Sequence, residues 1–123
     1  MLAMLILSLR TNAREINLVL EELNRGARER TYPHTLTRCF RTVEHDARVV
    51  GLDKLGEVIG WAKEAAERVL DPKAGPELIE LFSETTGELV RVADDLEQKR
   101  RHELDKDLVE RLKRAGGPRV VEE

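Results

Sequence analysis

Aliphatic residues recur at alternating three- and four-residue steps along most of this 123-residue chain. The first run comprises Leu2, Leu5, Ile6, Leu9, Ala13, Ile16, Leu20 and Leu23. This spacing places the apolar side chains on one face of an α-helix. Glycine is the residue that most often follows a helix, so we predict one long amphipathic helix that ends near Gly26.

Four further segments show the same spacing. They are predicted to cover residues 33–50, 53–71, 76–97 and 106–115. Pro33 and Pro76 suit the first turn of a helix, Asp53 can cap the third helix, and Gly51 can end the second. Amphipathic helices joined by short connections bury their apolar faces against one another. We therefore expect an all-α fold, an antiparallel four-helix bundle with a fifth short helix packed alongside.

No Pro-, Gly- or Ser-rich linker divides the chain. Residues 1–116 are thus expected to form a single domain, and residues 117–123 a flexible tail. Only 3% of the residues are aromatic, so the core of this domain must be aliphatic.

The composition restricts the cellular compartment and the classes of partner that we expect for this protein. The chain has 37% charged residues, a formal net charge of −3 and one cysteine, Cys39, which we expect in the core. A single cysteine forms no disulfide framework and suits a reducing compartment, so we predict a cytoplasmic protein. The acidic balance argues against general nucleic-acid binding. The apolar stretch at residues 1–9 is too short to span a bilayer and lacks the features of a signal peptide, so no membrane partner is expected.

The sequence contains no phosphate-binding glycine loop, no HExxH, no CxxC and no GxSxG motif. None of the three histidines, His34, His45 and His102, has a second histidine or cysteine at the spacing of metal ligands. We therefore predict no metal, no cofactor and no autonomous catalytic site.

One outward face of the second predicted helix is basic. At 100° per residue, five side chains lie opposite the inward apolar stripe, and we call them the basic ridge: His34, Arg38, Arg41, His45 and Arg48. The ridge is either an ordinary solvated face that is rich in arginine or a site for phosphoryl chemistry. An exposed imidazole with neighbouring cations suits phosphoryl transfer, because the nucleophile must be accessible and its surroundings must tolerate the anion.

The second helix resembles that of a known family. Residues 36–52 read Leu-Thr-Arg-Cys-Phe-Arg-Thr-Val-Glu-His-Asp-Ala-Arg-Val-Val-Gly-Leu. Without a gap they are similar to the motif Leu-Phe-Arg-Ala-Ala-His-Ser-Ile-Lys-Gly-Gly-Ala-Gly-Thr-Phe-Gly-Phe of histidine phosphotransfer (HPt) domains, especially the N-terminal domain of the chemotaxis kinase CheA. Residues 77–86 also look like that family's stretch Ile-Ile-Asn-Leu-Phe-Leu-Glu-Thr. The resemblance covers about residues 5–115 and implies a module of a bacterial two-component phosphorelay.

The departures from this motif fall on its polar network. The resemblance places Arg41 where the family has its phosphorylated histidine, and arginine cannot carry a phosphoryl group. Glu44 replaces a lysine that helps to hold that group, and Lys63 replaces the glutamate that orients the imidazole, although Glu64 is adjacent. The resemblance thus implies a scaffold that has lost its acceptor.

His45 is the alternative phosphoryl acceptor, one turn beyond Arg41 on the same face. In antiparallel helices it should face Ile59 and Gly60, and Asp46 should point about 100° away, so an orienting carboxylate is missing.

Three functions remain open. The leading hypothesis is a module that docks a response-regulator receiver domain or a histidine kinase module without being phosphorylated. The alternatives are an active phosphoryl carrier through His45 and a purely structural or dimerising bundle, in which residues 1–9 form a homodimer contact.

Overall fold

Each of the five segments with helical spacing forms an α-helix in the computed structural model, which describes residues 2–118. The elements are α1 (Leu2–Asn24), α2 (Thr31–Val49), α3 (Asp53–Ala65), the 3-10 turn η1 (Ala66–Arg68), α4 (Gly75–Glu97) and α5 (Lys106–Gly116). No strand occurs within residues 2–118, and the all-α expectation is confirmed. Of the predicted tail, residues 119–123 lie outside the described part of the chain.

Two glycines end helices as predicted, and one cap differs. Gly26 and Gly51 have φ angles of 97° and 84°, a backbone conformation that other residues rarely adopt. The prediction that Asp53 caps α3 is wrong. Leu52 holds the cap position without a side-chain hydrogen bond, and Asp53 is the first residue of the helix. A carboxylate in the first turn still interacts favourably with the helix dipole.

The third helix ends earlier than residue 71. Its α-helical geometry stops at Ala65 and continues as the short turn η1. The Asp71 carboxylate then accepts hydrogen bonds from the backbone N–H groups of Lys73 and Ala74, which closes a tight turn before α4. These two bonds lower the pKa of Asp71.

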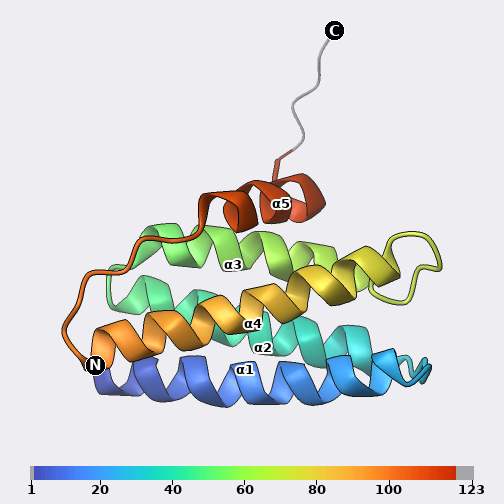
Figure 1. Ribbon diagram of the computed structural model, residues 1–123, viewed down its shortest axis with the longest axis horizontal. Coiled ribbons are helices and arrows are strands. Elements are labelled where there is room, and N and C mark those ends of the chain that lie inside the picture. Colours follow the sequence, from blue (N-terminus) through green and yellow to red (C-terminus); the bar gives the residue numbers. More distant parts are fainter. Residues whose placement is uncertain (1, 119–123) are drawn as a thin grey trace, which may run out of the picture.

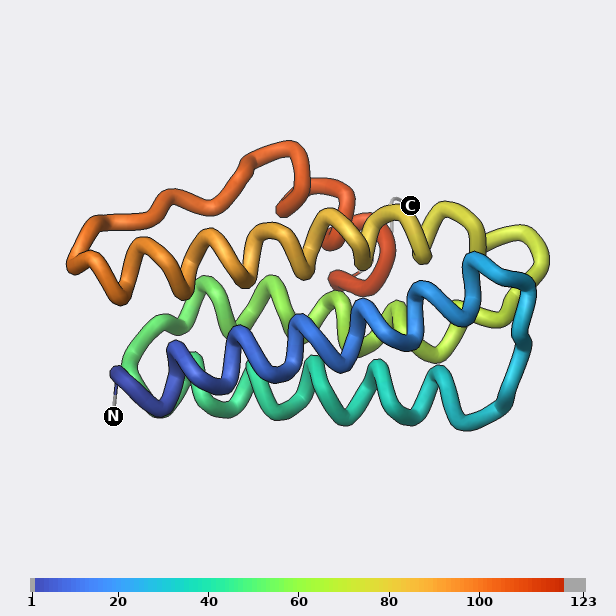
Figure 2. The backbone as a smooth tube through the Cα atoms, turned by 60° about the horizontal axis from the view of Figure 1, so that its bottom comes forward, coloured from blue at the N-terminus to red at the C-terminus, as the bar shows by residue number. Residues whose placement is uncertain are grey.

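The helices α1 to α4 lie side by side, and consecutive helices run in opposite directions (Figures 1 and 2). α1 packs against both α2 and α4, and α2 packs against α3. Phe40 from α2 and Phe82 from α4 meet in the core with ring centroids 5.1 Å apart. Residues 98–105 run back from the end of α4 to α5, which rests mainly on α3 (Figure 1).

The apolar stripe of α1 is buried from Leu5 to Leu23, as its spacing predicts, except that Ile6 is only partly buried. Its first member is an exception: Leu2 is exposed, as are Met4 and Leu7 on the outer side of the same helix. Within residues 2–118 no helix combines the length and the apolar character needed to cross a membrane.

Candidate docking surface on helix α2

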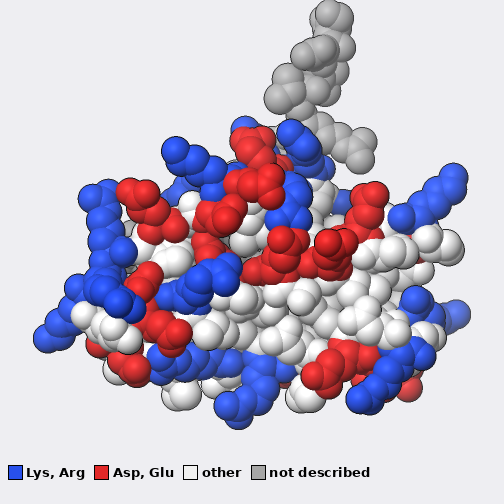
Figure 3. Space-filling view, viewed as in Figure 1, with Lys and Arg blue, Asp and Glu red and all other residues white. Residues whose placement is uncertain are grey.

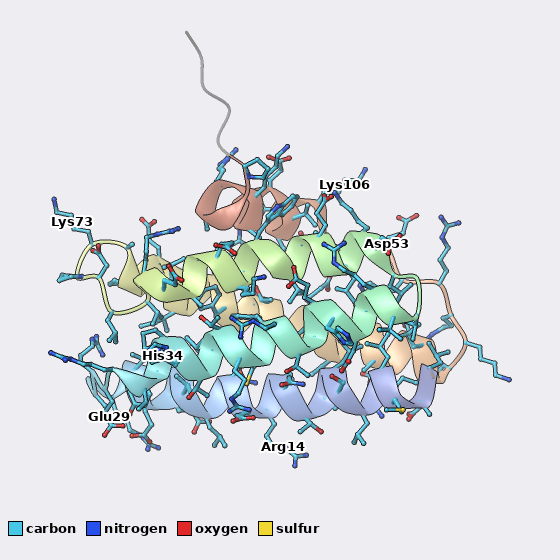
Figure 4. The ribbon with its side chains drawn as sticks, turned by 180° about the vertical axis from the view of Figure 1, so that it is seen from behind. Arg14, Glu29, His34, Asp53, Lys73 and Lys106 are labelled. Carbon is cyan, nitrogen blue, oxygen red and sulfur yellow. The ribbon has the colours of Figure 1, made fainter. Side chains whose placement is uncertain are left out.

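The five side chains of the basic ridge all lie on the exposed side of α2. Their exposure follows from the opposite face, which is buried through Leu36, Cys39, Phe40, Val43 and Ala47. Figure 4 shows α2 between α1 and α3 on the near side of the molecule, with His34 in its N-terminal part. The single thiol, Cys39, lies in the core as predicted, and burial raises its pKa to about 12.

The cations of the ridge differ in their partners. Arg38 donates a hydrogen bond to Glu15 of α1, which ties the two helices together. The Nη2 atom of Arg48 lies 3.9 Å from Oε2 of Glu44, one turn before it. Within residues 2–118, Arg41 makes no ion pair or side-chain hydrogen bond, so its guanidinium remains available to an incoming carboxylate or phosphate.

Glu44 and Lys63, two of the three positions that the resemblance singles out, meet between α2 and α3. Lys63 Nζ donates a hydrogen bond of 2.9 Å to Glu44 Oε1. The side chains are only 23% and 18% exposed, so water screens this pair less than a surface ion pair. Here the acid is on α2 and the base is on α3, whereas the resemblance implies a base at position 44 and an acid at position 63.

Gly60 makes room for this pair. A Cβ atom at position 60 would lie 2.4 Å from Glu44 Oε2, too close for the carboxylate to keep its place. Gly56, one turn earlier in α3, has a similar relationship with Arg48, because its Cβ would lie 2.8 Å from Arg48 Cγ. The α2 side chains therefore lie directly over the backbone of α3.

His45 is highly accessible, with 74% of its side chain exposed. Its Nδ1 lies 3.4 Å from Asp46 Oδ1, so the expectation that Asp46 points away is wrong. That distance exceeds the normal range of about 2.7–3.2 Å for a hydrogen bond from nitrogen. On α3, Ile59 and Gly60 are buried, and no ion pair joins His45 to this helix in the described part of the chain.

A second polar cluster was not anticipated. His102, which follows α4, is 13% exposed and lies between two carboxylates of that helix. Its Nδ1 is 2.7 Å from Asp95 Oδ2, and its Nε2 is 3.2 Å from Glu88 Oε2. Glu88 is 5% exposed and also accepts hydrogen bonds from Arg91 Nε and the backbone N–H of Asp105. The sequence signal that could have indicated this cluster is that Glu88 is an acidic residue at a position on the inward face of α4.

These contacts shift the pKa values within the cluster. For His102, burial alone would lower the pKa, but the contacts with Asp95 and Glu88 outweigh it and raise the pKa above 6.5. For Glu88, burial alone would raise the pKa, but the hydrogen bonds from Asp105 and Arg91 outweigh it and lower the pKa. The cluster therefore holds the His102 ring between two carboxylates of α4, and it anchors residues 98–105 to that helix.

The chemistry open to the ridge is recognition of an anion. Guanidinium groups bind carboxylates and phosphates through paired hydrogen bonds, and Arg41 offers such a group without a competing partner among residues 2–118. The described residues contain no group of three or more histidine, cysteine, aspartate or glutamate side chains placed to hold a metal ion. Comparison with protein-family models, curated proteins and solved structures finds no match to this chain.

Proposed function

We propose that this chain is an HPt-like signalling module, an antiparallel four-helix bundle with a fifth short helix. It docks a response-regulator receiver domain or a histidine kinase module through the basic ridge without being phosphorylated. The observation that carries the proposal is the Glu44–Lys63 ion pair. Residues 19 positions apart, both singled out by the resemblance and both carrying the opposite charge from the one it implies, are in contact, and Arg41, which the resemblance aligns with the acceptor, is exposed.

Electrostatics supports docking to a receiver. The phosphorylation pocket of receiver domains in that family is acidic, and a row of cations on one helix is complementary to it. Such complementarity chiefly raises the association rate and selects against wrong partners. Binding without phosphotransfer would sequester, inhibit or tether the partner.

The test is a titration of the whole chain with a panel of receiver domains and histidine kinase modules at two salt concentrations. Charge reversal in Arg41→Glu should weaken binding about tenfold or more and reduce its salt dependence. The control is Arg14→Glu, the same change on the exposed side of α1. Equal affinity of the wild type and the Arg41→Glu protein for a bound partner would contradict the proposal, as would the absence of binding to every receiver domain and every kinase module.

The first alternative is phosphotransfer through His45, which its exposure and its contact with Asp46 favour. An imidazole nitrogen would attack the phosphorus of a receiver's aspartyl phosphate, and the P–O bond would break as the carboxylate leaves. The label on the protein should be acid-labile and base-stable. It should disappear in His45→Gln, and a label that persists in this variant rules the alternative out.

The second alternative is a structural or dimerising bundle, which the exposed Leu2, Met4 and Leu7 favour. Sedimentation equilibrium distinguishes it, because a dimer formed through this face should dissociate in Leu7→Glu while the helix content stays the same.

A further inference from the structure

A groove lies at one end of the molecule, apart from the exposed face of the basic ridge. It is formed by the connection between α2 and α3, the last turns of α4, residues 98–105 and the start of α5. Its volume is about 980 Å³. Sites for small organic ligands typically have volumes of about 300–1,000 Å³.

The floor of the groove is aliphatic. It consists of Leu52, Leu55, Val92, Leu96, Leu104 and Val109. Four of these, Leu52, Leu96, Leu104 and Val109, pack against the core but stay partly exposed. A ligand with an alkyl chain would remove this surface from water, and burial of apolar area is the main driving force for such binding.

The rim of the groove is charged, with four cations and three acids. Its cations are Lys54, Arg100, Arg101 and Lys106, and its acids are Asp53, Glu103 and Glu110. Arg100 is paired with Asp95 at 3.2 Å and Lys54 with Glu57 at 3.0 Å. Arg101 and Lys106 form no ion pair within residues 2–118. In Figure 3 basic side chains gather at the end of the molecule where residues 98–105 run.

The outer wall of the groove is held in place. His102 lies between Glu88 and Asp95, and the N–H of Asp105 donates a 2.7 Å hydrogen bond to Glu88. These contacts fix both sides of Leu104 relative to α4. A site whose walls are already ordered loses less conformational entropy when a ligand binds.

We propose that this groove binds a small amphipathic carboxylate, a single aliphatic chain with one anionic head. The chain lies on the leucine and valine floor, and the carboxylate is held by Arg101 and Lys106. The aliphatic floor by itself would accept a neutral chain equally well, so the two cations without partners are what select the anion.

The experiment titrates the whole chain with dodecanoate below its micelle concentration. Trp61 is the only tryptophan, and Lys54, which lines the groove, lies 5.3 Å from the centroid of its ring. Trp61 fluorescence therefore reports on the groove, and isothermal titration calorimetry gives the stoichiometry. We expect saturable binding of one molecule per chain, with affinity at least about tenfold lower for dodecanol, which lacks the charge.

The variant that tests the rim is Arg101→Glu/Lys106→Glu, which should lower dodecanoate affinity at least about tenfold. The control is Lys73→Glu, which should bind as the wild type does. Lys73 is exposed at the end of the molecule opposite Asp53 and Lys106, as Figure 4 shows. Equal affinities of the rim variant and the control, or equal affinities for dodecanoate and dodecanol, would overturn the proposal. Self-association that dodecanoate does not reverse, and that the rim variant abolishes, would identify a second copy as the occupant and also overturn it.

Discussion

Lys63 of α3 and Glu44 of α2 are joined by a 2.9 Å hydrogen bond between charged groups, with both side chains mostly shielded from water. The HPt resemblance implies a lysine at position 44 and a glutamate at position 63, and this chain has the opposite charge at each position. The hydrogen bond between them ties α2 to α3.

Reversal of one charge in this pair should destabilise the protein. Lys63→Glu places two carboxylates together in a partly buried site, and we expect a loss of about 1–3 kcal/mol in the free energy of unfolding. The double exchange Glu44→Lys/Lys63→Glu should recover most of that loss, which urea unfolding of the four proteins measures as a double-mutant cycle. Arg25→Glu, at an exposed pair with Glu22, should have little effect. Additive effects of the two exchanges would show that the contact does not contribute.

The same exchange allows a test of the register of α2. In Glu44→Lys/Lys63→Glu/Arg41→His, all three positions of the polar network have the residues that the resemblance implies. We expect this protein to accept a phosphoryl group from a phosphorylated receiver and to form an acid-labile adduct. Arg41→His alone lacks the orienting carboxylate and should react more slowly. If the triple variant stays unlabelled while it binds the receiver, Arg41 does not occupy the acceptor position.

The buried histidine makes stability depend on pH. The pKa of His102 is raised in the folded protein, so its contribution is complete below about pH 6.5, the ordinary pKa of histidine, and is lost as the pH rises through the folded value. His102→Gln should cost about 1–3 kcal/mol at pH 6, because it removes one of the two cations, His102 and Arg91, that contact buried Glu88. The cost should be smaller at about pH 9, because the imidazole loses its proton as the pH rises through its raised pKa.

Urea unfolding at the two pH values measures this effect. The two carboxylates do not contribute to the difference between the two pH values. The pKa values of Glu88 and Asp95 are lowered, so both groups stay ionised at either pH. The control is His34→Gln at an exposed position of α2. A cost of His102→Gln that is the same at both pH values would contradict the raised pKa.

Two glycines should respond oppositely to alanine. A Cβ at Gly116 would lie 1.9 Å from the carbonyl oxygen of Trp61, which belongs to the backbone of α3 and cannot move aside. Gly116→Ala should therefore separate the end of α5 from α3 and lower the melting temperature. At Gly87, within α4, the nearest atom would be Arg91 Nη1 at 3.5 Å, an ordinary contact. Gly87→Ala should raise stability by up to about 1 kcal/mol through helix propensity. Thermal unfolding followed by circular dichroism measures the melting temperature of both variants. Equal changes in the two melting temperatures would show that α5 does not rest on the contact between Gly116 and Trp61.

The helices and their inward faces could be predicted because the information is local. The stripe from Leu5 to Leu23, the buried face of α2 and the glycines that follow both helices depend on residues within about one turn of each other. The errors lie at the ends of elements, where Leu52 rather than Asp53 precedes α3, and where Leu2, at the start of α1, is exposed. The position of a helix end depends on backbone hydrogen bonds that several nearby residues can supply, so spacing alone does not identify the cap.

Helical spacing was thus enough to predict which residues are helical, which side of each helix is apolar and that α2 exposes a row of cations. It could not predict that Glu44 contacts Lys63, that Glu88 and Asp95 enclose His102, or that residues 98–105 form the wall of an aliphatic groove. The two groups of features differ in the distance along the chain over which the interacting residues lie. Helical periodicity depends on residues three and four positions apart in the sequence. The tertiary contacts depend instead on how whole helices pack and on where a connecting segment is anchored.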